Sequence, residues 1–466
     1  MPLFGVNREV LEKLIALALS RGGDYADVFF EYTTSDELTL RDNEVNSVES
    51  SADYGVGIRV LKDGRTGYAY SESTDIREME RAAVTASSIA DGQCGNIASA
   101  GFRKVGFEDR YPVLKNWEDY PASARKEYLQ QINDMVFGLN ENIRKVIADL
   151  AFDNTKVLFY NSLGEYYCDE RPVASLIVSC ILSKDGVQEN TTVSRSYRMG
   201  SEMLTTELQN EIAAELKKNM VHLFDAGRPK GGKMPVVMGS GSSGILLHEA
   251  IGHAFEADFN RKGISIFSDK MGRKICSEKI SVVDDGTLQA NRGSVNVDDE
   301  GVPGQKTYMV KDGVLTSYLH DRISAAHYGV APTGNGRRES FRFNPIPRMR
   351  ATYMEDGDCT EEEIIHSVKN GIYVDNFTNG QVEIGAGDFT FYVKSGRLIE
   401  NGRLTAPIKD VNIIGNGPEA LADIVAIAAN SRVDNGTWTC GKDQDCLVSC
   451  GMPSVLVKSL TVGGSI

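Results

Sequence analysis

The stretch Asp225-Ala-Gly-Arg-Pro-Lys-Gly-Gly-Lys divides the chain into two parts of different character. Glycine, proline and charged residues concentrate in it, a composition that interrupts helices and strands and is typical of linkers. We therefore predict a domain boundary here, with an N-terminal domain over residues 1–226 and a C-terminal domain over residues 227–466.

The first part mixes amphipathic helices with strand-like segments. Apolar residues at helical spacing predict helices over 8–21, 75–90, 122–138 and 201–222. Strand-like alternation covers 27–73 and 143–198, where turn signals such as Lys62-Asp-Gly-Arg interrupt it. Because short turns join these strands, we predict an α+β domain with a mainly antiparallel sheet.

The second part is richer in strands. Strands are predicted over 234–238 and most of 280–410, and helices over 361–370 and 418–430. Thr360 and Glu363 form a capping box before the first of these helices, and Pro418 suits the first turn of the second.

Composition excludes several classes of protein. The 466 residues include 65 acidic and 50 basic ones, a net charge of -15, which disfavours nucleic acid as a partner. No apolar run is long enough to span a membrane, so we expect no membrane partner. The first residues lack the pattern of a secretory leader, so we expect a cytoplasmic protein with reduced thiols. Five scattered cysteines are expected to be small core residues: Cys94, Cys168, Cys180, Cys276 and Cys359.

The most informative segment for function is His248-Glu249-Ala-Ile-Gly-His253. Neutral imidazoles are good zinc ligands, and a neighbouring carboxylate can accept a proton from metal-activated water. On a regular helix, residues five apart diverge by about 140°. The helix must therefore bulge or end between the histidines to let both bind one ion, and Gly252 is placed to allow this.

Spacing alone does not select a third metal ligand. Seven residues are candidates: Glu256, Asp258, His320, His327, Cys440, Cys446 and Cys450.

Several specific motifs resemble the TldD branch of the TldD/PmbA family, also called modulators of DNA gyrase. They are Gly244-Ile-Leu-Leu-His-Glu-Ala-Ile-Gly-His, Asp298-Asp-Glu-Gly-Val-Pro-Gly-Gln, Pro332-Thr-Gly-Asn-Gly-Arg-Arg-Glu-Ser, Pro347-Arg-Met-Arg-Ala-Thr-Tyr-Met and Cys440-Gly-Lys. The resemblance covers essentially the whole chain and is densest from about residue 234 onward.

The resemblance implies a two-lobed zinc metallopeptidase with an α+β first domain and a β-rich, barrel-like catalytic domain. It implies His248, His253 and Cys440 as zinc ligands, Glu249 as catalytic base, and extended or unfolded peptides as substrates. It also implies a homologous PmbA/TldE-type subunit, or a homodimer, as partner. The sequence departs from the family at Cys446 and Cys450, and at His320, which we expect at the surface or in a turn.

Two further segments are candidates for substrate binding. The Gly/Ser loop containing Gly241 and Gly244 could present free N–H groups to a substrate, or simply connect a strand to a helix. The polar loop with Asn335, Arg337 and Arg338 could hold a peptide, or its arginines could form internal ion pairs. For the acidic run Asp298-Asp-Glu, we expect a solvated turn rather than a cation site.

Two other functions stay open. The chain could be a non-catalytic regulatory or binding module with a structural zinc, or a zinc amidohydrolase acting on small molecules. Glu249 favours a catalytic site, because a structural zinc needs no base beside its ligand.

Overall fold

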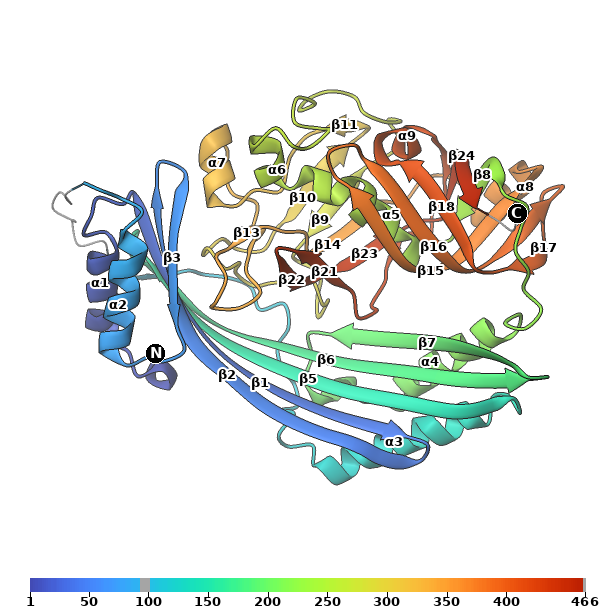
Figure 1. The fold of residues 1–466 in the computed structure, drawn as a ribbon, viewed down its shortest axis with the longest axis horizontal. Coiled ribbons are helices and arrows are strands. Elements are labelled where there is room, and N and C mark those ends of the chain that lie inside the picture. The colour runs from blue at the N-terminus through green and yellow to red at the C-terminus, as the bar shows by residue number, and fades with distance from the viewer. Residues whose placement is uncertain (93–100, 464–466) are drawn as a thin grey trace.

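A computed structural model describes residues 1–92 and 101–463, with all their side chains except those of residues 378 and 379. A long bent sheet forms the first lobe, and the second lobe lies in its concave side (Figure 1). Both lobes combine helices with strands, which confirms the predicted α+β class. Cys94, expected in the core, lies outside the described residues.

The sheet of the first lobe is built from unusually long antiparallel strands. Its order is β3 (Arg65–Ser71), β2 (Glu44–Lys62), β1 (Tyr25–Arg41), β5 (Ile143–Asn161) and β6 (Glu165–Lys184), with β4 (Arg103–Lys104) and β7 (Val187–Tyr197) both paired to β6. The β1–β5 register runs unbroken from Asp27–Asn161 to Arg41–Ile147. Side chains therefore alternate strictly between the two faces along β1.

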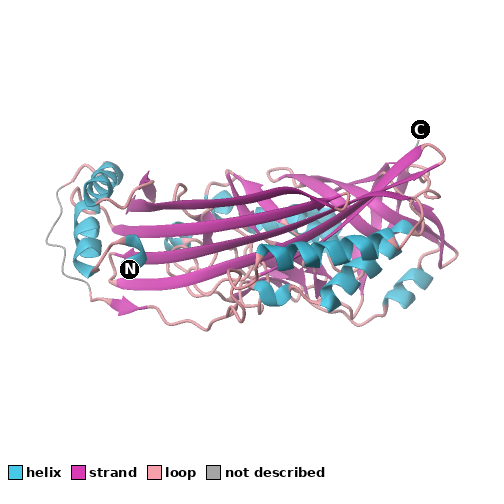
Figure 2. Ribbon diagram, turned by 90° about the horizontal axis from the view of Figure 1, so that it is seen from below, coloured by secondary structure: helices cyan, strands magenta, loops and turns pink. Residues whose placement is uncertain are grey.

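Helices cover one face of this sheet. They are α1 (Arg8–Ala18) and α2 (Ile76–Ser87) near one end, and α3 (Ala122–Phe137) and α4 (Thr206–Met220) near the other (Figure 2). The even-numbered residues Phe30 and Leu38 of β1 pack beneath these helices. The odd-numbered Phe29 clusters instead with Phe341 of the second lobe. One strand thus supplies both the core of its own lobe and the contact between lobes.

The second lobe contains a closed five-stranded barrel, as expected for a β-rich, barrel-like domain. Its order is β15 (Asn370–Glu383), β8 (Gly232–Met238), β24 (Val455–Gly463), β18 (Val411–Asn416) and β16 (Asp388–Glu400), and β16 pairs with β15 to close the ring. Strands β17 (Arg403–Ile408) and β19 (Ile424–Ile427) extend it. The predicted boundary at residue 226 falls between α4 and β8 and stays a prediction.

A second sheet packs beside the barrel. Its order is β11 (Val314–Leu315), β10 (Lys306–Lys311), β9 (Val282–Asp285), β14 (Ala351–Met354), β23 (Ser449–Met452) and β20 (Arg432–Val433). Two hairpins stand apart from it: β12–β13 (Gly336–Arg337, Ile346–Pro347) and β21–β22 (Thr439–Lys442, Gln444–Leu447). The remaining helices of the lobe are α5 (Ile245–Leu247), α6 (Ala257–Arg261), α7 (Arg322–Tyr328), α8 (Glu361–Ser367) and α9 (Gly417–Ala422). None of the helices in the described part of the chain is both long and apolar enough to cross a membrane.

The acidic run Asp298–Glu300 is buried between the lobes, so the expectation of a solvated turn is wrong. Arg59 of β2 donates to Asp27 of β1 at 2.9 Å and to Glu300 at 2.5 Å, and all three side chains are fully buried. Arg171 of β6 reaches Asp299 at 2.6 Å. Arginines of the first lobe therefore neutralise acids of the second and hold the lobes together.

The predicted helices are present, and one of them is shorter than expected. The capping box of Thr360 and Glu363 precedes α8. The helix predicted over 418–430 is wrong beyond Ala422, because Ile424–Ile427 forms β19 and pairs with β24.

Cys180 and Cys276 are buried and Cys359 is half-buried, but Cys168 is exposed, since it alternates along β6 with the buried Tyr167.

Candidate metal centre

The two histidines are brought together by a single π-helical turn. Residues His248–Gly252 adopt this conformation between α5 and a 3₁₀ turn at His253–Phe255. The N–H of His253 donates to the carbonyl of His248, five residues earlier. The wider turn returns residues five apart to one side of the helix, and the imidazole centroids lie 5.1 Å apart. The predicted bulge is confirmed.

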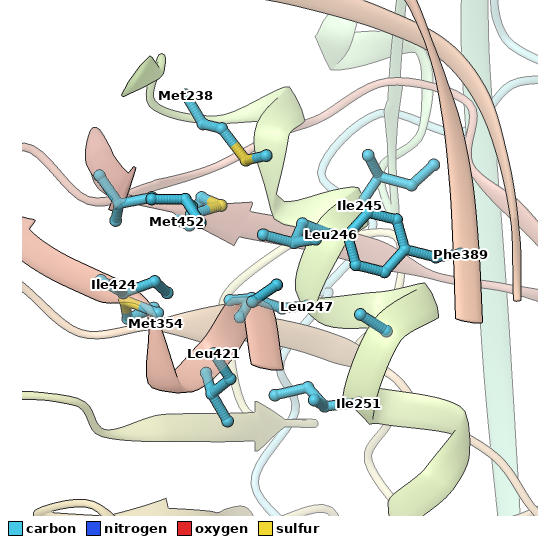
Figure 3. Packing of buried hydrophobic residues seen from close by; sticks show 14 of the residues in the cluster. Met238, Ile245, Leu246, Leu247, Ile251, Met354, Phe389, Leu421, Ile424 and Met452 are labelled. Carbon is cyan, nitrogen blue, oxygen red and sulfur yellow. The ribbon is translucent and has the colours of Figure 1, made fainter. Parts of the chain in front are cut away.

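Apolar residues of the same segment fix this turn in the core of the lobe. Leu246, Leu247 and Ile251 are buried against residues of the barrel, of β14 and of β23 (Figure 3). Gly252 has ordinary helical dihedral angles. A Cβ atom there would lie 2.2 Å from Sδ of Met349. Glycine is therefore needed for close packing, and not for an unusual backbone conformation as the sequence suggested.

Cys440 joins the histidines from β21. Its Sγ lies 3.2 Å from Nε2 of His253. One ligand atom from each of His248, His253 and Cys440 lies within 4.8 Å of the other two. The three side chains are 4%, 5% and 6% exposed, so the group is shielded from bulk water.

Glu256 supports His253 from behind. Its carboxylate accepts from Nδ1 of His253 at 3.0 Å and lies 3.1 Å from Nζ of Lys442 and 3.6 Å from Nε of Arg348. Burial alone would raise the pKa of Glu256, but Lys442 and His253 lower it to about 2. A carboxylate on Nδ1–H fixes the imidazole tautomer and turns Nε2 toward the thiol. Glu256, a candidate ligand from the sequence, contacts the second nitrogen of a histidine instead.

The electrostatics of the group favour a thiolate. Burial would raise the pKa of Cys440, but the charges and hydrogen bonds of His248 and His253 lower it to about 4. For His253, burial lowers the pKa, yet Glu256 and Cys440 raise it to about 10. Nδ1 of His248 is buried and has no hydrogen-bond partner among the described residues. Two imidazoles and a thiolate are a typical donor set for zinc, so these residues fit that metal.

Glu249 lies beside this group and remains accessible. Its Oε2 is 4.0 Å from Nε2 of His253, and its side chain is 19% exposed. Burial raises the pKa of Glu249 above its ordinary value. Strand β15 passes close by, since a Cβ atom on Gly380 would lie 3.5 Å from Cγ of Glu249. A partly exposed carboxyl with a raised pKa is suited to proton transfer near neutral pH.

The other candidate ligands lie outside the group of His248, His253 and Cys440. Cys446 stands opposite Cys440 in the β21–β22 hairpin, and burial raises the pKa of its thiol. Asp258 holds Lys442 at 2.7 Å. His320 is buried against Tyr318 and Tyr328, so its expected surface position is wrong. Cys450 packs in the core and His327 lies in α7, so neither of them belongs to the group among the described residues.

The residues predicted to bind substrate all have structural contacts. Gly241 has a φ of 88°, which favours glycine, and a Cβ atom on Gly244 would lie 2.2 Å from the backbone of Gly451. Asn335 bonds to Asp284 and to the carbonyl of Arg348, the Arg337 guanidinium donates to the carbonyls of Met349 and Leu447, and the backbone N–H of Arg338 donates to Asp299. Their role in substrate binding stays a prediction.

Sequence reasoning missed Lys442 and Arg348, which hold Glu256 in place. Lys442 belongs to the Cys440-Gly-Lys motif, so its spacing from Cys440 was a signal. Arg348 donates to the carbonyl of Cys440 as well, and so ties the thiol hairpin to the histidine segment. Arg348 belongs to the Pro347-Arg-Met-Arg motif, but the sequence did not indicate its contacts with Glu256 and Cys440, because these partners lie far away in the chain.

Comparisons with known proteins agree along the whole chain. Family models described as PmbA/TldA metallopeptidase domain 1, central domain and C-terminal domain match residues 26–90, 115–223 and 231–464. A metalloprotease TldD homolog of Haemophilus influenzae is 34% identical over 99% of this chain and 97% of its own length. A zinc metalloprotease TldD homolog of Saccharolobus solfataricus is 27% identical over 97% of this chain and 99% of its own.

Among solved structures, TldE from Thermococcus kodakarensis has a similar fold. The TM-score is 0.76 at 20% sequence identity, and the match covers 98% of this chain and 100% of that one. At this identity, the likeness bears on the fold alone.

Proposed function

The chain belongs to the PmbA/TldD family of metallopeptidases, and on this basis we propose that it is a zinc-dependent enzyme cutting extended or unfolded peptides. His248, His253 and Cys440 would hold the zinc, and Glu249 would act as general base. The observation that carries this proposal is the convergence of two imidazoles and a thiol beside a partly exposed carboxyl.

The chemistry divides between the metal and the side chains around it. When bound, zinc supplies Lewis acidity, which makes a water molecule acidic near neutral pH and polarises a carbonyl group. Glu249, whose pKa burial raises, accepts a proton from the attacking water and returns it to the leaving nitrogen. Glu256 keeps His253 in the tautomer that presents Nε2 to the metal.

The free edge of β15 supports an extended substrate. Strand β8 pairs with β15 only at Ile372–Val374. Beyond that point, the pairing of β15 continues with β16 alone among the described residues. A peptide added along this edge would pass Glu249, because Gly380 lies beside it. Scanning a peptide substrate with proline tests this mode, and full tolerance of proline beside the cut bond would contradict it.

A structural zinc site is the alternative that the geometry favours less. Structural zinc is normally enclosed by four protein ligands. Among the described residues, the group has three, with Glu249 beside them. That arrangement leaves a position for water or substrate, as in catalytic sites.

We also propose that the chain works in the cytoplasm, with a homologous PmbA/TldE-type subunit or a second copy of itself. The similar fold of the TldE structure supports a partner of the same architecture. Light scattering after size-exclusion chromatography would detect a dimer. A monomer at all concentrations, with full activity, would contradict the assembly.

The decisive experiment combines metal analysis with peptide cleavage. We expect about one zinc per chain by mass spectrometry in the wild type and in Glu249→Gln. Cleavage of a long unstructured peptide should fall about a thousandfold in Glu249→Gln. Glu400→Gln, which changes an exposed carboxyl on β16, serves as the control and should keep full activity. Equal cleavage by wild type and Glu249→Gln would contradict the assigned base, and cleavage of small amides alone would favour an amidohydrolase.

A further inference from the structure

A cavity of about 670 Å³ lies between the concave face of the first-lobe sheet and the second lobe. The sheet contributes residues such as Glu31 and Arg171, and the second lobe contributes Arg337, Arg350 and part of the β21–β22 hairpin. The three metal-site residues do not line it, although Thr439 and Cys446 of their hairpin do. Its volume is typical of sites for small ligands.

Three arginines in the wall of this cavity lack an acidic partner. Arg198, Arg337 and Arg350 are 6%, 6% and 3% exposed. The Arg337 guanidinium donates to two backbone carbonyls, and Nε of Arg350 donates to the carbonyl of Gly334 at 2.6 Å. Nε of Arg198 is buried without any partner in the described chain. Within 4.0 Å, the described residues place no carboxylate beside any of the three guanidinium groups.

Three buried acids near these arginines are engaged elsewhere or uncharged. Asp299 accepts from Arg171 at 2.6 Å and from the backbone N–H of Arg338 at 2.8 Å. Asp298 accepts three backbone N–H groups. Burial, followed by the charge of Asp299, raises the pKa of Glu31 to about 8, so this carboxyl is neutral at pH 7. Four other carboxylates also line the cavity: Asp53, which pairs with Arg342, and Asp153, Glu339 and Asp445. Among the described residues, none of them lies within 4.0 Å of the three arginines, so these guanidinium groups have no direct ion-pair partner.

A buried guanidinium group without such a partner is costly in a folded protein. A guanidinium group stays charged even when buried, and a buried charge is normally paired. Burial above all, and then the neighbouring arginines, lower the pKa of Arg198 and Arg350, so keeping both groups charged in this wall has an energetic cost. An anion in the cavity would relieve this cost.

We propose that this cavity binds an oxyanion, a phosphate or carboxylate group, through Arg198, Arg337 and Arg350 at a site distinct from the metal centre. The planar guanidinium matches both kinds of oxyanion through paired N–H donors. The oxyanion could belong to a free phosphate or to the terminal carboxylate of a bound peptide. The site does not depend on catalysis, so its test stands apart from that of the peptidase.

The test compares the wild type, Arg198→Met and a control, Arg125→Met, by titration calorimetry at constant ionic strength. Arg125 stacks on Trp117 under the opposite face of the sheet and does not line the cavity. Inorganic phosphate is the first probe. The second is an unstructured peptide with a free C-terminus, compared with the same peptide amidated, both in a Glu249→Gln background that prevents cleavage.

We expect the wild type and Arg125→Met to bind one probe saturably and Arg198→Met to bind it at least about tenfold more weakly. Binding of phosphate would identify a free anion, and preference for the free C-terminus over the amide would identify a peptide carboxylate. Arg198→Met should unfold at no lower temperature than the wild type in anion-poor buffer, because it removes an unpaired buried charge. Binding of neither probe, or equal binding by Arg198→Met and the wild type, would overturn the proposal.

Discussion

The segments His248–Glu256 and Asp298–Glu300 both bury ionisable groups, yet they differ in what those groups contact. In the acidic segment, arginines and backbone N–H groups satisfy every carboxylate. In the histidine segment, three potential ligand atoms face one another, and Nδ1 of His248 has no partner among the described residues. Burial of charge therefore does not mark a functional site. The convergence of three potential metal ligands on one point is what distinguishes the histidine segment.

The largest expected effect comes from removing the thiolate. Cys440→Ser should lower zinc content from about one per chain to a small fraction, and peptide cleavage should fall with it, since a neutral hydroxyl is a poor substitute for a thiolate ligand. Mass spectrometry of tag-free protein measures the metal. Cys450→Ser is the matched control, because Cys450 is equally buried but packs in the core. Zinc retained in Cys440→Ser would move the third ligand to Cys446, Cys450 or an acid.

Breaking the ion pairs of the acidic segment should lower the stability of the protein without changing its metal binding. Arg59→Met removes the buried guanidinium that bonds both Asp27 and Glu300, which should cost about 3–5 kcal/mol in the free energy of unfolding. Denaturant titration measures this loss, and the folded protein should keep its zinc.

A surface pair provides the control for that variant. Lys279 and Asp358 form an ion pair whose side chains are 56% and 64% exposed, so Lys279→Met should leave the midpoint of the denaturant titration almost unchanged. Equal effects of Arg59→Met and Lys279→Met would mean that the buried network adds no more than a surface pair.

Glu256 shares a feature with each segment. It is a buried acid whose charge is paired, and it also orients a potential metal ligand. Glu256→Gln should weaken zinc binding about 10- to 100-fold, since Nδ1 of His253 loses its charged acceptor. Competition with a chelator of known affinity measures this change, and Glu400→Gln is the control. Unchanged affinity would show that the carboxylate serves only Lys442 and Arg348.

The sequence predicted local structure better than it predicted contacts between residues far apart in the chain. The Thr360–Glu363 capping box and the bulge between the histidines both depend on neighbours in the chain, and both are present. The helix predicted for residues 424–427 was wrong, because a short apolar run fits either a helix or a strand, and here pairing with β24 makes it a strand.

Distant partners explain what the sequence could not show about the site. Cys440 is 187 residues from His253, and Glu300 is 241 residues from Arg59. Spacing therefore left seven candidates for the third ligand, and only the family resemblance distinguished Cys440. The same distance made the Asp298–Glu300 run look solvated, since none of its arginine partners from the first lobe lies near it in the sequence.

The last prediction concerns Glu31, which lies in the cavity with the unpaired arginines. Its pKa is about 8 when folded, against an ordinary value of 4.5. The folded state therefore binds a proton that the unfolded state releases as pH rises above about 4.5, so wild-type stability falls between that pH and about 8. Glu31→Gln removes this loss, and its stability relative to the wild type should be greater at pH 9 than at pH 4, by about 1.4 kcal/mol for each unit between the two pKa values.

Denaturant titrations at both pH values measure the difference, with the exposed Glu44→Gln on β2 as the control. A relative stability that does not change with pH would mean that Glu31 is ionised when folded. Its carboxylate would then offset part of the positive charge of Arg198, Arg337 and Arg350. The cavity would resemble the satisfied acidic segment more than the metal centre, and its need for an external anion would be correspondingly smaller.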